Sequence, residues 1–578
     1  MTSMNALTSH GKLDRRALPD PATSQLFGQA FEAPEGETET TMAAIWADVL
    51  GVERVGRHDN FFELGGHSLL VTQVVSRVRQ ALNVQVPLRT LFEHSSLEDF
   101  VAALGVDQAH REPPIVALPR LQPLALSYAQ ERQWFLWQLE PTSTAYHVPA
   151  ALRLRGELDL PALQRSFDAL IERHESLRTC FVEQQGQTLQ VIQAHGTLDL
   201  QVQDVAADLD EAALQALVAA ETLHLFNLQQ GPLLRVKLLR LAADDHALVI
   251  TLHHIVSDGW SMNVMVDELV ALYAACSQGQ SVQLPALPVQ YADYAVWQKQ
   301  WMDAGERERQ LSYWTAQLGD GDQPLLELPT DRPRPAEQSY RGARRDIPLS
   351  VELATALKHL AQRENVTLFA LLLASFQTLL HRYSGQADIR VGVPVANRNR
   401  VETEGLIGFF VNTQVLKAEF DSQQTFRSLL QQVKNTVLGA QAHQDLPFEQ
   451  LVDALQPERS LSHSPLFQVM HNHQSQVRQA QGATRLSKLA IEGLPWASST
   501  AQFDLTLNTF ESSDNVWAEL TYATDLFDVE TIERLAQHWT HLLQGIVADS
   551  TQRIAELPLH DAAEHAATLR QWNPAIRD

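Results

Sequence analysis

The chain has 578 residues and a formal net charge of −25, with 45% apolar and 20% charged residues. That length exceeds what one hydrophobic core usually organises, so we expect two to four domains. The acidic balance argues against nucleic-acid binding, and no apolar run is long enough to span a bilayer. Two widely spaced cysteines, Cys180 and Cys276, argue against a disulfide framework and a structural zinc site. We therefore expect a cytoplasmic protein that binds neither nucleic acid nor membrane.

The first folded unit is expected between residues 39 and 105. Residues 21–38 before it have the composition of a linker, and residues 106–120 after it contain three prolines. Between these linkers, apolar residues recur at helical spacing in about three segments, which predicts a small helical bundle. The recurring residues include Met42, Ile45, Trp46, Val49, Leu50, Leu69, Leu70, Val74, Val75 and Val78.

From residue 121 onward, strand and helix patterns alternate. A break rich in proline, aspartate and arginine near 320–337 divides this part into two α+β lobes, which we place at 121–330 and 331–565. The predicted strands are 150–154, 246–252 and 389–395, and the predicted helices are 160–174, 262–275, 350–363 and 368–382.

Ser68 lies in the segment Asp-Asn-Phe-Phe-Glu-Leu-Gly-Gly-His-Ser-Leu-Leu at 59–70. Gly65 and Gly66 allow a sharp turn, and Ser68 stands where the helical pattern begins. A serine there is ordinarily an N-cap, although a helix N-terminus also suits a phosphate ester. No histidine or acid is placed locally to activate Ser68, so modification by another protein is the more plausible chemistry.

The whole segment resembles the 4′-phosphopantetheine attachment site of peptidyl carrier domains in nonribosomal peptide synthetases. The resemblance implies that a phosphopantetheinyl transferase attaches 4′-phosphopantetheine covalently to Ser68. The thiol of that arm would then hold an aminoacyl or peptidyl thioester. His67 before the serine resembles carriers that work with a condensation domain and not with an epimerase.

Both ends of the chain resemble parts of adenylation domains. Residues 7–19 are similar to the last motif of such a domain, in which a lysine at the position of Lys12 touches the adenylate. We expect residues 1–20 to be a remnant in which Lys12 is inert. Residues 566–578 resemble a linker to a following adenylation domain. Flanking adenylation domains are therefore expected partners in a longer synthetase.

His253 and His254 open the segment His-His-Ile-Val-Ser-Asp-Gly, which follows an apolar strand and precedes a helix. Strand alternation would point the two rings to opposite faces, and Asp258 with Gly259 predicts a tight turn. Adjacent strand residues diverge, and the spacing matches no common zinc pattern, so we expect no metal. Taken alone, the pair predicts hydrogen-bonded histidines at a strand end.

Further segments in the same order change this interpretation. Together with the His-His segment, they are similar to the motif series of condensation domains. The resemblance implies two lobes of the chloramphenicol-acetyltransferase-like type that meet in a V, with the His-His segment at the floor of a tunnel. These further segments are 127–136, 173–179, 291–297, 407–413 and 443–449.

The chemistry that this resemblance implies is amide formation by the amine of a downstream acceptor carrier. We expect neutral His254 to accept or steer the amine proton, and the Gly259 N–H to face the developing oxyanion. Asp258 is expected to be structural, because a buried carboxylate needs a cationic partner. Arg398 is our candidate, in a pairing that would hold the two lobes in register. His253 is expected to pack or to orient the turn.

Three alternative functions stay open at this point. An epimerization domain shares the His-His segment, but residues 408–413 and His67 argue against it. A dual epimerizing condensation domain would show an additional His-His element near its start, where only His147 is found. A catalytically silent module that presents the carrier is the third alternative. The amino-acid substrates are not encoded here, and an L-configured donor is our preference.

Overall fold

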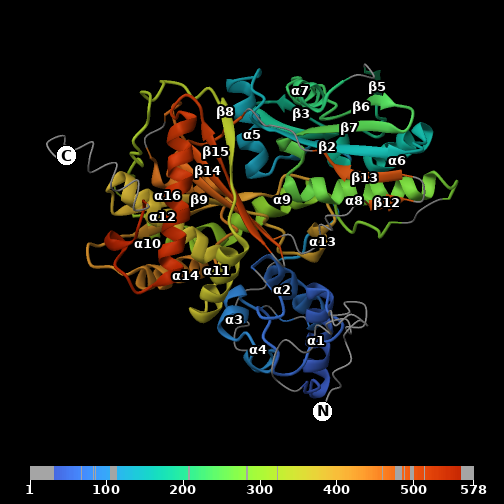
Figure 1. The fold of residues 1–578 in the computed structure, drawn as a ribbon. Helices are drawn as coiled ribbons and strands as arrows, with labels where there is room; N and C mark the ends of the chain where they lie inside the picture. The colour runs from blue at the N-terminus through green and yellow to red at the C-terminus, as the bar shows by residue number, and fades with distance from the viewer. Residues whose placement is uncertain are drawn as a thin grey trace, which may run out of the picture.

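The computed structural model describes residues 31–560, apart from 67, 83, 85, 105–112, 206–208, 281–283, 320, 322, 458–459, 476–483, 487–488, 495–499 and 513–514. The expected adenylation remnant with Lys12, His67 and the tail at 566–578 lie outside the described residues. The described chain forms a small helical unit below a larger, two-lobed α+β unit (Figure 1).

The helical unit has four described helices and not the three that we predicted. They are α1 (Gly36–Leu50), α2 (Ser68–Leu82), α3 (Leu88–Glu93) and α4 (Leu97–Ala103). Helix α3 was missed because six residues after Pro87 are too few to show a helical period. The centre of its core is aromatic: the Trp46 ring contacts Phe61 edge-on with centroids 5.0 Å apart, and its centroid lies 6.0 Å from that of Phe100.

The first lobe is built on a six-stranded sheet in the order β12-β13-β2-β7-β6-β5. Leu248, Ile250 and Leu252 of the central strand β7 belong to the core formed with α6 and α8, whereas Ala247 and Val249 pack with α7. Side chains alternate along a strand, so β7 is buried on both faces. Bounds are β2 (His147–Gly156), β5 (Gln201–Asp204), β6 (Leu234–Ala242), β7 (Asp245–His253), α6 (Leu160–Arg173), α7 (Glu211–Thr222) and α8 (Gly259–Cys276).

The second lobe has its own six-stranded sheet, in the order β10-β9-β11-β14-β15-β8. Helices α11, α12, α14 and α16 contribute to the large hydrophobic core of this lobe. Bounds are β8 (Gly342–Ile347), β9 (Asp388–Val395), β10 (Asn412–Glu419), β11 (Val469–Ser475), β14 (Leu505–Glu511), β15 (Val516–Ala523), α11 (Val351–Arg363), α12 (Leu368–Ser384), α14 (Phe426–Gln441) and α16 (Val529–Ala548).

Two strands cross from one lobe to the other. Strands β12 (Thr484–Leu486) and β13 (Leu489–Gly493) fall in the range that we assigned to the second lobe, yet β13 pairs antiparallel with β2 of the first. Its register runs from Leu489 opposite Gly156 to Gly493 opposite Leu152. The two lobes are therefore interlocked by main-chain hydrogen bonds as well as by side-chain packing.

The remaining elements lie at the edges of the sheets and between the lobes. They are α5 (Tyr128–Leu139), α9 (Tyr291–Trp301), α10 (Arg307–Leu318), α13 (Val401–Glu404), α15 (Phe448–Leu455), a small sheet of β1 (Leu124–Ala125), β3 (Thr179–Gln184) and β4 (Gln187–Ile192), the 3₁₀ turns Glu175–Arg178, His254–Val256 and Ile554–Glu556, and the π-helical turn Met302–Glu306.

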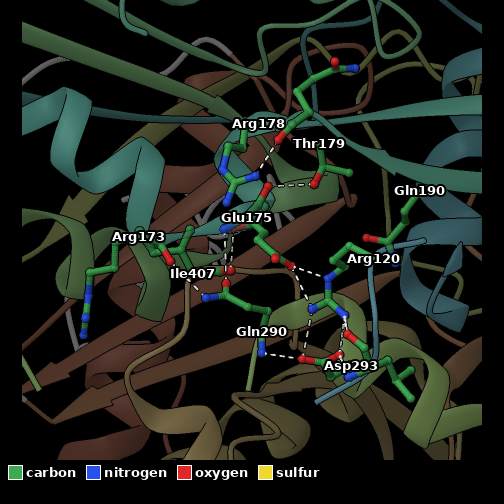
Figure 2. Close-up of polar contacts among 12 residues, drawn as sticks. Arg120, Arg173, Glu175, Arg178, Thr179, Gln190, Gln290, Asp293 and Ile407 are labelled. Carbon is green, nitrogen blue, oxygen red and sulfur yellow. Dashed lines mark hydrogen bonds and ion pairs between the residues drawn. The ribbon is translucent and has the colours of Figure 1, made fainter. Parts of the chain in front are cut away.

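An ionic cluster fastens the segment that enters the larger unit. Figure 2 shows the Arg120 guanidinium between two carboxylates, with Nε 2.8 Å from Glu175 Oε2 and Nη1 2.7 Å from Asp293 Oδ1. Asp293 Oδ1 also accepts the Leu118 N–H at 2.9 Å. Asp293 is 1% exposed, so this is a charge pair largely shielded from water. The start of the two-lobed unit is thus fixed against α9.

The segment from Ile407 to Phe410 threads between the lobes and tolerates no extra atom at Gly408. Tyr291 OH donates to Phe409 O at 2.6 Å, and its buried ring lies against Gly408. A Cβ on Gly408 would overlap that ring. We predict that Gly408→Ala lowers the free energy of unfolding of the two-lobed unit by about 1–3 kcal/mol, measured by chemical denaturation. Gly405→Ala is the control, since its Cβ would lie 3.5 Å from Leu287, and an equal loss there would contradict this reasoning.

Candidate active site

The His-His segment is a tight connection between β7 and α8. Strand β7 ends at His253, a 3₁₀ turn covers His254–Val256, and α8 begins at Gly259. Asp258 is the N-cap of α8, and its Oδ1 accepts the Ser261 N–H at 2.8 Å. We expected a tight turn at Asp258–Gly259 and a helix only from 262. The helix starts earlier because Asp258 caps it by accepting the Ser261 N–H, one of the N–H groups that have no acceptor within the helix.

The two histidine rings point in different directions, as strand alternation indicated. The ring of His253 lies among first-lobe residues, with its centroid 6.1 Å from those of His147 and Phe226. Its Nδ1 accepts the Ile255 N–H at 3.1 Å, and burial holds the pKa of His253 well below its usual range. The ring of His254 instead packs on Phe409 of the second lobe, with centroids 4.5 Å apart. The His253 ring is therefore bonded within its own turn, and the His254 ring faces the junction between the lobes.

His254 is held in one tautomer by its own turn. Its Nδ1 lies 2.7 Å from the carbonyl oxygen of Ser257. A carbonyl only accepts, so Nδ1 carries the proton and Nε2 keeps a free lone pair. Burial lowers the pKa of His254, although the negative charge of Asp258 raises it in part. The ring is thus neutral near pH 7, with Nε2 ready to accept a proton.

Asp258 and Arg398 form an ion pair with both side chains 0% exposed, and Arg398 Nη2 lies 3.1 Å from Asp258 Oδ1. This is the pairing expected from the sequence. The second carboxylate oxygen of Asp258 accepts the Phe410 N–H at 3.0 Å. Both oxygens are therefore occupied by donors, which leaves the carboxylate in a structural position.

The guanidinium of Arg398 is held on several sides. Its Nη1 donates to Thr403 O and Leu406 O, both at 2.7 Å, and its Nη2 also donates to Ser261 Oγ at 2.7 Å. The ring of Phe410 faces the guanidinium at 4.1 Å. Burial lowers the pKa of Arg398, which the charge of Asp258 opposes. Four hydrogen bonds, one of them to the Asp258 carboxylate, thus compensate for the loss of water around this cation.

Sequence reasoning missed Ser261, which joins the two lobes. Its Oγ donates to Gly408 O at 2.8 Å and accepts the Gly408 N–H at 3.0 Å. A serine three residues after an N-cap aspartate is too common to stand out. The signal that could have identified Ser261 was the motif Ile407–Phe410, whose backbone is hydrogen-bonded to both Asp258 and Ser261. Gln130, from another motif, donates to Ile255 O at 3.2 Å.

Gly259 leaves open space at the N-terminus of α8. A Cβ there would meet none of the described heavy atoms within 4 Å, and the backbone φ of Gly259 is not left-handed. Packing and backbone strain therefore give no reason for a glycine. Room for a bound molecule beside the first free N–H groups of a helix is a physical reason.

Ser68 is the first residue of α2, at the end of a glycine turn. Gly65 has φ +99°, which favours glycine, and a Cβ on Gly66 would overlap the ring of Phe61. The turn therefore fixes where α2 starts. A helix N-terminus offers N–H groups and a positive dipole end to a phosphate ester, so this position fits a 4′-phosphopantetheine arm.

Within the described part of the chain, no group of three or more histidine, cysteine, aspartate or glutamate residues is arranged to hold a metal ion. The described helices also include none that is long and apolar enough to cross a membrane.

We predict that Arg398→Met lowers the free energy of unfolding by about 3–5 kcal/mol, because Asp258 is left charged without a partner in the interior. The matched control is Arg155→Met, which breaks an exposed pair with Glu492 and should cost less than about 1 kcal/mol. Calorimetric or denaturant unfolding of both variants measures the difference. Equal stabilities would show that the buried pair does not hold the lobes together.

Comparisons with known proteins agree with this geometry. Residues 121–569 match the family described as "Condensation domain", and residues 40–104 match "Phosphopantetheine attachment site". The chain is 48% identical to one of the linear gramicidin synthase proteins of Brevibacillus parabrevis, over 99% of this chain and 8% of that protein. It is 38% identical to surfactin synthase subunit 1 of Bacillus subtilis (strain 168), over 98% of this chain and 15% of that protein.

Solved structures share the two-lobed fold. The X-domain from teicoplanin biosynthesis, in complex with OxyB, covers 78% of this chain and 99% of its own, with a TM-score of 0.72 and 28% identity. A four-domain nonribosomal peptide synthetase bound to AMP and glycine covers 80% of this chain and 35% of its own, with a TM-score of 0.70 and 25% identity. The chain spans a small part of the length of the synthetases that it matches. The chain belongs to the condensation-domain family of nonribosomal peptide synthetases, and a phosphopantetheine-bearing carrier domain precedes its condensation domain.

Proposed function

We propose that the chain forms a peptide bond between a donor carried at Ser68 and the α-amine of an aminoacyl group on a downstream acceptor carrier. The observation that carries the proposal is the tautomer of His254, whose Nδ1–H is bonded to Ser257 O, so that Nε2 is the nitrogen with the lone pair. When attached to Ser68, 4′-phosphopantetheine supplies the thiol that holds the donor as a thioester. The rest of the chemistry falls to the residues around His254.

The reaction forms one C–N bond and breaks one C–S bond. The neutral amine attacks the donor carbonyl carbon, and the electron pair of the C–S bond leaves with the sulfur. His254 Nε2 accepts or steers the amine proton, which ends on the released thiolate, so atoms and charge balance. The negative charge that develops on the carbonyl oxygen is stabilised by the free N–H groups at the start of α8, near Gly259. Placement of the two reactants contributes at least as much as proton transfer.

Asp258, Arg398 and His253 act by position. Asp258 caps α8 and anchors Arg398, so the turn that presents His254 is fixed to both lobes. His253 receives the Ile255 N–H and holds the same turn from the other side. A residue in such a role changes the rate by moving His254 and does not touch the substrate itself.

The partners follow from the same proposal. A phosphopantetheinyl transferase modifies Ser68, an adenylation domain loads the arm, and a downstream carrier delivers the amine. Residues 39–105 act as the carrier, and 121–330 with 331–565 act as the two lobes. Cytoplasmic action is supported by two cysteines that are free thiols, Cys180 and Cys276.

The alternative functions have less support. The match to the condensation family favours bond formation over epimerization. His147, the one histidine near the start of the larger unit, is bonded through Nδ1 to Thr222 O at 2.7 Å and packs near His253. A silent presenting module is distinguished by experiment, since it would not depend on His254.

We predict that His254→Ala lowers the single-turnover rate of dipeptide formation by about 10²–10⁴-fold, because the group placed to accept the amine proton is lost. The donor is loaded enzymatically as aminoacyl-pantetheine on Ser68, an aminoacylated acceptor carrier is added, and dipeptidyl-carrier is followed by intact mass. His195→Ala, at a side chain that is 87% exposed, should leave the rate unchanged.

The Ser68→Ala variant should show no loading and no product. Ordinary turnover by Ser68→Ala would refute the carrier assignment. Ordinary turnover by His254→Ala, with Ser68 normally loaded, would instead favour the silent module.

The pH dependence should show two ionisations. An α-amine with a pKa of about 7.7–8.0 must be neutral to attack, so the logarithm of the rate falls with slope one below that pH. His254 must also be neutral, and burial lowers its pKa below the usual value of about 6.5. Slope two should therefore begin only below pH ~6.5, and His254→Gln should keep slope one throughout. Slope two that already begins at pH 7 would contradict a neutral His254 with a lowered pKa.

A further inference from the structure

Two arginines in the second half of α2 reach the larger unit, and α3 of the carrier also lies against α14 of the second lobe. Arg77 reaches Glu404 at the end of α13, with Nη1 to Oε1 at 3.3 Å and Nη2 to Oε2 at 3.4 Å. Arg79 Nη2 donates to Asn399 O at 3.3 Å. In Figure 1, α2 lies directly beneath α13. Two parallel hydrogen bonds between a guanidinium and a carboxylate fix orientation as well as distance.

The Arg77–Glu404 ion pair is half-buried, so salt screens it less than it screens an exposed surface pair. The side chains of Arg77 and Glu404 are only 25% and 18% exposed. Burial raises the pKa of Glu404, and the charge of Arg77 lowers it. Without Arg77, Glu404 would keep a partly desolvated carboxylate next to Asp48 of α1, which lies 3.5 Å from Arg77 Nε. The surface on α13 is therefore complementary to the arginine side of α2.

The docking element α13 is itself built into the site. Glu404 O accepts the indole N–H of Trp260 at 2.9 Å, and Trp260 stands two residues after Asp258. Thr403 O accepts from Arg398, the partner of Asp258. The α13 segment thus has the carrier on one side and the buried ion pair of the candidate active site on the other.

The linker brings the carrier to this surface. Pro113 O accepts the Trp297 indole N–H at 2.8 Å and an Arg400 N–H at 3.0 Å, so the linker is fastened beside α13 from Pro113 onward. Nine peptide steps separate Leu104, at the end of α4, from Pro113. They allow at most about 30 Å between the two points. The carrier is thereby confined near α13 at a high effective concentration, so a polar contact of modest strength is enough to dock it.

We propose that α13 is the docking site through which the larger unit holds its own carrier as donor, and that Arg77 with Glu404 is the contact that selects the carrier. This inference rests on the proposed function and adds the surface by which the donor is presented. The partner is a carrier helix with an arginine nine residues after its attachment serine, about 14 Å along the helix axis.

Charge reversal on each side tests the proposal in the full chain. Arg77→Glu and Glu404→Arg are each expected to slow dipeptide formation about tenfold, because each places like charges at the contact. The Arg77→Glu/Glu404→Arg double variant is expected to return to within about threefold of the original rate, since the pair is restored with opposite polarity. Arg54→Glu is the matched control on the carrier, where the guanidinium lies 4.2 Å from the centroid of the Phe31 ring. It should leave the rate unchanged.

Two further measurements separate folding and function from docking. Mass-detected loading of Ser68 and an unchanged unfolding transition show that each variant still folds. In the Arg77→Cys/Glu404→Cys variant, a short bismaleimide should link the two positions, and in Arg54→Cys/Glu404→Cys it should not. Cross-linking needs no catalysis, so absence of dipeptide with normal cross-linking would defeat the proposed function alone. Single reversals without effect, single reversals that accelerate the reaction, or a double variant without recovery would overturn the docking proposal.

Discussion

The buried ion pair between Asp258 and Arg398 is the constraint on which the rest of the site depends. Two charges at 0% exposure lose their hydration, and such a pair persists only where further hydrogen bonds compensate. Here Asp258 accepts the N–H groups of Ser261 and Phe410. Arg398 donates to the carbonyl oxygens of Thr403 and Leu406. The same atoms that satisfy the charges therefore tie the start of α8 to the loop of the other lobe. His254 stands on the turn that this arrangement fixes.

The arrangement explains why residues of one short motif have different tasks. His253 is buried with an occupied Nδ1, and Asp258 has both oxygens engaged. His254 alone in this motif combines a fixed tautomer with a free nitrogen. Gly259 adds open space beside free N–H groups. In the proposed reaction, the chemistry is thus concentrated on one ring, and the charged residues around it supply geometry. In the same proposal, Ser68 only anchors the donor, on a unit that contacts α13 through Arg77.

Much of this could be predicted from the sequence, and the limits have physical causes. Strand alternation predicted the divergence of His253 and His254, and the cost of a buried charge led from Asp258 to Arg398. The pairing of β13 with β2 could not be predicted, because nothing in the sequence of a five-residue strand indicates which strand, more than 300 positions away, it will pair with. Helix α3 was too short to show a period. Arg77 and Glu404 look like ordinary surface charges until the two units are placed together.

The most direct test of the account is the pH–rate profile of Asp258→Asn in single-turnover dipeptide formation. If Asp258 is structural and acts on His254 only through its charge, removing that charge lowers the pKa of His254 further. The pH at which slope two begins should then move to lower values, while the proton-accepting step persists at a reduced rate. If the His254 ionisation stays at the same pH, or disappears so that only the amine is seen, Asp258 and His254 do not have the relation described here.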